Sequence, residues 1–150
     1  MAADGLYSQI SAVTRLELCS LLCGYPPNTL ASTIDGEDDS MKIDFVITEL
    51  DMGGAERCLA ALAVHAQSEH HQVRVIALGP KPPEGRDGLV GMLESHKITL
   101  HFLNGRKFWE FPWVLRRLMR VVQCDRPDLA QSFLFHANVA SAFVYPKLSI

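Results

Sequence analysis

Two adjacent glycines, Gly53 and Gly54, stand between a short β-branched run and a segment of helical composition. Glycine has no Cβ, so the backbone at such a point can approach a ligand closely. A helix that begins beside the glycines presents unpaired N–H groups and the positive end of its dipole. The pattern therefore predicts a cradle for a phosphate or diphosphate, with an ordinary tight turn as the alternative.

The residues around the glycines do not match two common phosphate-binding motifs. There is no G-x-G-x-x-G dinucleotide fingerprint, and no Gly-Lys-Ser/Thr follows as in a P-loop. Glu56 falls in the first turn of the expected helix, where it is either a ligand-side group or an acid that stabilises the helix dipole.

A second polar pair, His136 and Asn138, follows an apolar segment near the end of the sequence. We expect both in the loop after a strand. His136 is a candidate ligand contact, or alternatively a local helix cap. Asn138 is a candidate contact or a helix-turn residue.

The elements that must position these groups alternate along the chain. We expect strands at 43–48, 73–78, 98–103 and 129–134, and helices at 55–68, 89–95, from Pro112 onward and from 137 to 145. Strict alternation of strand and helix predicts an α/β fold with a parallel sheet and helices on both faces. Ligands of such sheets bind at the carboxyl ends of the strands.

Several of these segments together resemble glycosyltransferase family 4. Residues 42–57, KIDFVITELDMGGAER, resemble the family's first strand and its Gly-Gly-Ala-Glu-Arg turn, and residues 59–63, LAALA, resemble the helix that follows. Residues 71–75, HQVRV, resemble a Gly-His-x-Val pattern, and residues 126–138, RPDLAQSFLFHAN, resemble the fourth-strand signature and its turn. The resemblance covers residues 42 to about 145.

This resemblance implies a GT-B architecture, in which two Rossmann-like domains face each other across a cleft. It implies a retaining enzyme that moves a sugar from a nucleotide-sugar donor to a glycan or lipid-linked acceptor without a metal or other cofactor. The chain corresponds to the amino-terminal, acceptor-side domain. Gly53 and Gly54 would face the diphosphate or acceptor, and Glu56 would cap or orient the turn. Catalytic residues stay unassigned.

The sequence departs from the family pattern in two ways. Phe133 and Gln131 stand where the family often has histidines near the transferred sugar. The length also covers most, but not all, of one domain of a two-domain enzyme. We therefore expect an incomplete Rossmann-like domain that is inactive unless another chain supplies the second half. A non-catalytic Rossmann-like remnant or interaction module is the alternative; a stand-alone nucleotide-binding protein is disfavoured by the missing fingerprint.

Composition supports one globular body and an unequal charge distribution. Of the 150 residues, 48% are apolar and 21% charged, which excludes wholesale disorder. Residues 1–40 hold one basic and six acidic residues, a charge of −5, and residues 41–150 hold thirteen basic and eleven acidic residues, a charge of +2. We predict an irregular, poorly ordered acidic extension over 1–40 and the partial domain over 41–150. Met41 is interpreted as a natural domain start or as a linker residue.

The charge of −3 does not indicate a nucleic-acid partner. A basic strip on the helix after Pro112, next to an aromatic run at 108–113, has two interpretations: a peripheral membrane contact, or a solvated helix face backed by core aromatics. Neither the cysteines nor the histidines have metal-ligand spacing, so we expect no metal site. The expected location is the cytoplasm, with at most a peripheral contact to the inner face of a membrane.

Overall fold

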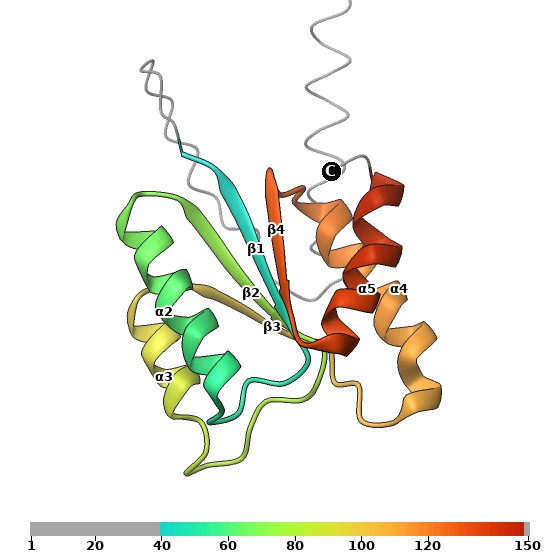
Figure 1. Cartoon of the computed structure of the whole chain (residues 1–150), viewed down its shortest axis with the longest axis horizontal. Coiled ribbons are helices and arrows are strands. Elements are labelled where there is room, and N and C mark those ends of the chain that lie inside the picture. Colours follow the sequence, from blue (N-terminus) through green and yellow to red (C-terminus); the bar gives the residue numbers. More distant parts are fainter. Residues whose placement is uncertain (1–39, 149–150) are drawn as a thin grey trace, which may run out of the picture. The chain divides into compact units, whose positions relative to one another are not determined.

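The computed structural model of the chain describes residues 40–148 (Figure 1). The acidic extension predicted over residues 1–40 lies outside the described residues, except for Ser40, and stays a prediction.

Strands and helices alternate along residues 40–148 as the sequence predicts. The strands are β1 (Lys42–Ile47), β2 (Gln72–Ala77), β3 (Thr99–Phe102) and β4 (Leu129–Phe133). The helices are α2 (Gly54–Ser68), α3 (Gly88–Ser95), α4 (Phe111–Cys124) and α5 (Phe135–Val144), with short 3-10 turns η1 (Phe108–Glu110) and η2 (Tyr145–Leu148). Within this part of the chain, no helix is long and apolar enough to cross a membrane.

The four strands form one parallel sheet in the order β3-β2-β1-β4. Ile47 at the end of β1 is in register with Ala77 of β2 on one side and with Phe133 of β4 on the other. The predicted α/β class with a parallel, Rossmann-like sheet is therefore confirmed.

Helices cover both faces of the sheet, α2 and α3 on one side and α4 and α5 on the other (Figure 1). Alternation along the strands explains this arrangement, because successive side chains point to opposite faces. In β2, Val73, Val75 and Ala77 pack under α2 and α3, whereas Ile76 packs under α4 and α5. Buried residues at three- and four-residue spacing hold each helix on its core, for example Val114, Leu118 and Val122 of α4.

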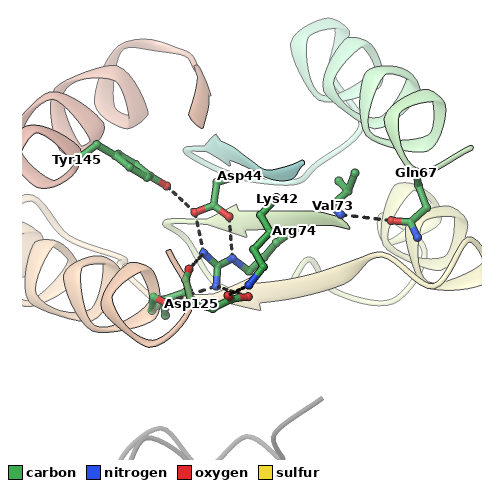
Figure 2. Close-up of polar contacts among 8 residues, drawn as sticks. Lys42, Asp44, Gln67, Val73, Arg74, Asp125 and Tyr145 are labelled. Carbon is green, nitrogen blue, oxygen red and sulfur yellow. Dashed lines mark hydrogen bonds and ion pairs between the residues drawn. The ribbon is translucent and has the colours of Figure 1, made fainter. Parts of the chain in front are cut away.

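A buried charged group lies among these apolar contacts on the α4–α5 face. Asp44 of β1 is 1% exposed and sits beside Arg74 of β2 in the sheet register. The guanidinium donates from Nε and Nη2 to the two carboxylate oxygens, at 2.7 and 2.8 Å. The Tyr145 hydroxyl donates to Asp44 at 2.9 Å, so Asp44 has donors on both sides (Figure 2). The Asp44 carboxylate therefore accepts three hydrogen bonds from two side chains.

The surroundings shift the titration of two members of this network. Burial lowers the pKa of Arg74, but the hydrogen bond and charge of Asp44 raise it above its ordinary value. Burial, and then the Asp44 charge, raise the pKa of the Tyr145 hydroxyl. Arg74 Nη2 also donates to the Asp125 carbonyl at 2.9 Å, which ties the end of α4 to the sheet. The network therefore joins β1, β2, α4 and η2 with all charges kept.

Candidate functional site

The sheet reverses its strand order between β1 and β4. The chain builds β1, β2 and β3 in one direction, then returns to place β4 on the other side of β1. From these neighbouring strand ends, α2 leaves to one face of the sheet and α5 to the other (Figure 1). Such a switch point at the carboxyl ends of parallel strands is where open α/β sheets bind ligands. The two sets of site residues predicted from the sequence follow these two strands: the glycine turn with Glu56 follows β1, and His136 and Asn138 follow β4.

The glycine turn after β1 is built by Asp51. The Asp51 carbonyl accepts a hydrogen bond from the Gly53 amide at 3.1 Å, and its carboxylate accepts from the Met52 amide at 2.8 Å. Gly53 is the N-cap of α2 with φ −108° and ψ −178°, an extended conformation open to any residue. Backbone conformation therefore does not require glycine at this position, and the surrounding space must be considered.

The two glycines have different surroundings. A Cβ on Gly53 would lie 2.1 Å from Oε2 of Glu56, because the Glu56 carboxylate folds back over the Gly53 backbone. A Cβ on Gly54 would meet nothing within 4 Å, and Gly54 is exposed. Gly54 thus presents open backbone at the switch point, while Gly53 is covered by Glu56.

The first turn of α2 faces this open space with its amides. Arg57 N bonds back to the Gly53 carbonyl at 3.2 Å, which closes the first helical turn. Gly53, as the N-cap, has no side chain to accept a bond, and the amides of Gly54, Ala55 and Glu56 have no partner among residues 40–148. Unpaired amides at the positive end of a helix dipole attract an anion.

The junction between β4 and α5 is strained. Leu134 has φ 70° and ψ 158°, a region that non-glycine residues rarely adopt, and it ends the strand one residue earlier than predicted. Helix α5 begins at Phe135, so the prediction that His136 and Asn138 lie in a loop is wrong. Both lie in the first turn of α5, because the sharp bend at Leu134 replaces a loop.

Asn138 holds this bend in place. Its backbone amide donates to the Leu134 carbonyl at 3.0 Å. With its side-chain nitrogen turned toward β4, it also donates to the Ser132 hydroxyl and carbonyl, at 2.9 and 3.1 Å, and to the Leu134 carbonyl at 3.2 Å. These contacts correspond to the helix-turn alternative for Asn138.

His136 is exposed at the same junction, and its ring meets Phe135 edge-on with centroids 5.7 Å apart. Phe133, which stands where the family often has histidine, lies under α2 instead, with its ring centroid 6.3 Å from that of Phe45. Phe133 therefore contributes to the core and presents no polar group to the site.

Three further residues at this edge were not predicted from the sequence. Thr48 directly follows β1, and its buried hydroxyl has no hydrogen-bond partner in the described part of the chain. The Arg86 guanidinium, from the loop after β2, forms a two-pronged ion pair with the Asp51 carboxylate, with Nε to Oδ1 at 3.0 Å. The position of Thr48 directly after a predicted strand could have indicated that it lies at this edge of the sheet. The ion pair between Arg86 and Asp51 joins two loops that are far apart in the sequence, so no local pattern predicts it.

One other hollow of the described residues lies away from the switch point. An open groove of about 510 Å³ lies between α2 and α3, lined by Arg57, Ala61, Val64, His65, Ser68, Leu89 and Met92. Its lining is mostly apolar and it lies on the α2–α3 layer, so we do not assign the chemistry to it. Among residues 40–148, no three His, Cys, Asp or Glu side chains are grouped as metal ligands would be.

Comparisons with known proteins agree with this geometry. The family model described as Glycosyltransferase Family 4 matches residues 52–149, which confirms the resemblance found in the sequence. A crystal structure of a glycosyltransferase from Rickettsia africae ESF-5 shares the fold, with a TM-score of 0.55 and 17% identity. The match covers 73% of this chain but 27% of that one. Among curated proteins, no sequence matches.

Proposed function

The chain belongs to glycosyltransferase family 4, and from this we propose that it forms the amino-terminal, acceptor-side part of a retaining transferase that uses a nucleotide-sugar donor. One observation carries the proposal: the family match includes an open backbone turn, at Gly54, located at the switch point of the sheet. The unpaired amides and the positive end of the α2 dipole at that turn suit the negative charge of a diphosphate.

In the proposed reaction, the bond between the sugar and the nucleotide diphosphate breaks and negative charge develops on the leaving phosphate. The unpaired amides of Gly54, Ala55 and Glu56 would donate to that charge, supported by the dipole of the fifteen-residue helix α2. Such preorganised donors stabilise a leaving anion without a metal ion. Glu56, folded over Gly53, would keep the turn in position rather than contact the phosphate.

The acceptor side of the proposed site is the β4–α5 junction. His136 is exposed in the first turn of α5 and would contact a hydroxyl of the sugar or acceptor. Asn138 is bonded to Ser132 and Leu134, so its contribution would be to fix the strained bend that aims His136. The acceptor would be a glycan or a lipid-linked group, and the compartment the cytoplasm.

The nucleotide would be held largely by a second Rossmann-like domain, in a GT-B arrangement. This chain spans 27% of the length of the Rickettsia structure. We therefore expect no transfer by this chain alone and transfer when a nucleotide-binding half is supplied, on the same or another chain.

Binding at the turn can be tested before activity. NMR spectra of the isotope-labelled chain would be recorded with uridine and guanosine diphosphate sugars and with inorganic pyrophosphate. We expect saturable shifts of the Gly54, Ala55 and Glu56 amides. Gly54→Val would abolish them by filling the open space, whereas Gly91→Val on α3, where a Cβ also meets nothing within 4 Å, would not.

Activity would then be measured after fusing the chain to the nucleotide-binding half of an active family 4 enzyme. Hydrolysis or transfer of the donor sugar, lost with Gly54→Val, supports the proposal. Saturable binding with no turnover in such a fusion, or no shift of the turn amides at all, would instead favour a non-catalytic interaction module.

A further inference from the structure

The two tryptophans of the chain stand four residues apart in sequence, and both are exposed. Trp109 in η1 is 72% exposed, and Trp113 in the first turn of α4 is 64% exposed. The interpretation that the aromatic run backs the core holds for Phe111, which packs against it, but not for the two tryptophans, because Val114, Leu118 and Val122 fill the core face of α4. Large aromatic rings left in water at this extent call for a partner that covers them.

Cations surround the two rings. On α4, Trp113, Arg116, Arg117 and Arg120 recur at three- and four-residue spacing, which places them on the outer face of the helix. The Lys107 ammonium lies 5.3 Å from the centroid of the Trp109 ring. We call the surface formed by Arg106, Lys107, Trp109, Trp113, Arg116, Arg117 and Arg120 the basic-aromatic face.

The charge of this face has one sign. Residues 104–124 contain five basic residues and one acid, Glu110, which gives 5 − 1 = +4. The Glu110 carboxylate accepts bonds from the amides of Arg106 and Lys107, at 2.9 and 3.3 Å, so it is engaged by its own loop. Arg117 donates to the Leu103 carbonyl at 2.6 Å, while no ion pair of Arg116 or Arg120 occurs within residues 40–148.

The face adjoins the candidate site. The segment 103–110 follows the carboxyl end of β3, and the glycine turn follows the carboxyl end of β1 in the same parallel sheet. Both therefore lie along one edge. A partner on the basic-aromatic face would be held at the edge where the open backbone of Gly54 lies.

We propose that the basic-aromatic face docks the protein on the surface of an anionic lipid bilayer. A helix with an apolar inner face, arginines on its outer face and flanking tryptophans lies parallel to a membrane, with its cations at the lipid phosphates and its rings among the headgroups. A nucleic-acid duplex would use the arginines, but its bases are already stacked on one another and would leave the two rings uncovered. The proposal does not depend on sugar transfer, since docking needs no reaction.

The two tryptophans make the test specific, because all tryptophan emission of the full chain comes from this face. The chain would be titrated with vesicles of phosphatidylcholine alone and with vesicles containing about one third phosphatidylglycerol. We expect a blue shift and quenching by brominated lipid with the anionic vesicles only, weakening as salt is added. Absence of the shift with anionic vesicles, or an equal shift with neutral ones, overturns the proposal.

Two double variants distinguish binding through the basic-aromatic face from attraction of the whole protein's charge to the vesicles. Arg116→Ala with Arg120→Ala should lower the partition coefficient roughly thirtyfold, at about fivefold for each cation. Arg57→Ala with Arg126→Ala removes two exposed arginines elsewhere and should change it less than about threefold. Alanine favours helix, so α4 should persist, as circular dichroism would verify. Equal losses in both variants, or binding of an RNA duplex with none of vesicles, overturn the proposal.

Discussion

At the scale of single residues, Asp44 shows how a charge is kept in the core. Its carboxylate is 1% exposed and is held by two N–H groups of Arg74 and the hydroxyl of Tyr145. A buried ion stays charged only when such partners replace water. Tyr145 contributes one of these three bonds from 101 positions along the chain, so removing its hydroxyl tests the network with little change in volume.

We predict that Tyr145→Phe lowers the free energy of unfolding by about 2 kcal/mol, since a hydrogen bond to a buried charged group is lost. Urea denaturation at neutral pH would measure the loss. Lys42→Ala is the matched control, because its ion pair with Asp125 is exposed and should contribute less than about 1 kcal/mol. Similar losses of unfolding free energy in the two variants would show that the buried hydrogen bond stabilises the fold no more than the exposed ion pair does.

His101 on β3 gives a second residue-scale prediction. Burial, and then the charge of Arg74, lower the pKa of His101 from its ordinary value to about 4. Because the folded pKa lies below the unfolded one, the unfolded chain takes up the proton first as the pH falls. Stability is therefore present above about pH 6.5 and declines as the pH falls toward about 4, by at most about 3 kcal/mol from this group.

The measurement is the free energy of unfolding from pH 7 to pH 4 for the native chain and for His101→Leu. Carboxylates titrate in both proteins, so only the difference between the two slopes reports His101. We expect the variant to lose less stability on acidification. Parallel slopes would mean that His101 has the same pKa in the folded and unfolded chains.

The residue scale also shows where sequence reasoning reaches its limit. The strand predicted at 73–78 is enough to put Val73, Val75 and Ala77 on one face, as the structure shows, because alternate side chains of a strand point the same way. The partner of Asp44 at Tyr145 could not be predicted, since it depends on how α5 and η2 return to the sheet. The sequence left open whether Trp109 and Trp113 are exposed, because an aromatic residue near an apolar stripe fits either face of a helix.

At the scale of elements, the β1–α2 turn keeps a glycine at a position where alanine would make the helix more stable. Gly54 is the first residue of α2, and a Cβ there meets open space. Alanine is favoured over glycine in a helix by roughly 0.5–1 kcal/mol. A glycine where alanine would be more stable is consistent with a site that needs bare backbone.

We predict that Gly54→Ala raises the thermal midpoint of the ligand-free chain, whereas Gly53→Ala lowers it by displacing the Glu56 carboxylate, whose Oε2 would lie 2.1 Å from the new Cβ. A clash with the end of a flexible side chain is modest, so we expect a loss of about 0.5–1 kcal/mol. Scanning calorimetry would rank the two.

Glu56→Ala in the Gly53→Ala background is the control for this mechanism. Removing the displaced carboxylate should recover part of the loss if the clash is its cause. If Gly54→Ala is also destabilising, the open space beside α2 is not available to a side chain in solution.

Element boundaries were predictable where periodicity was strong, and failed at β4–α5. Nothing about Leu134 indicates a positive φ, because leucine rarely adopts one. The bend is imposed by the strand pairing of Phe133 with Ile47 and by the bonds of Asn138 to Ser132 and Leu134. These are contacts across elements, so a local sequence pattern places His136 in a loop where the structure places it in a helix.

At the scale of the whole described unit, alternation of strand and helix was enough to predict a parallel sheet with two helical layers. The strand order was not predictable from alternation, since it depends on which side of β1 receives β4. That one choice creates the switch point and, among residues 40–148, leaves β4 at the edge of the sheet. It also brings the turns after β1 and β4 together, on which the proposed site depends.

The edge position of β4 leads to a prediction about self-association. Within residues 40–148, β4 pairs with β1 alone, and Leu129 on this strand is 47% exposed. Phe135 and Phe143 of the following helix are 74% and 55% exposed. An unpaired strand edge beside exposed apolar side chains is a template for another chain. We therefore predict reversible self-association as the concentration rises from about 5 to about 100 μM.

Sedimentation velocity would follow the association, and Leu129→Lys should shift it to higher concentration, because a lysine on an edge strand opposes strand-to-strand pairing. Met92→Lys is the control. Met92 is 36% exposed on α3, which covers the face of the sheet opposite to α5, so this substitution should leave association unchanged. Equal effects of the two lysines would indicate general charge repulsion. A chain that stays monomeric across this range would show that the β4 edge is protected in solution.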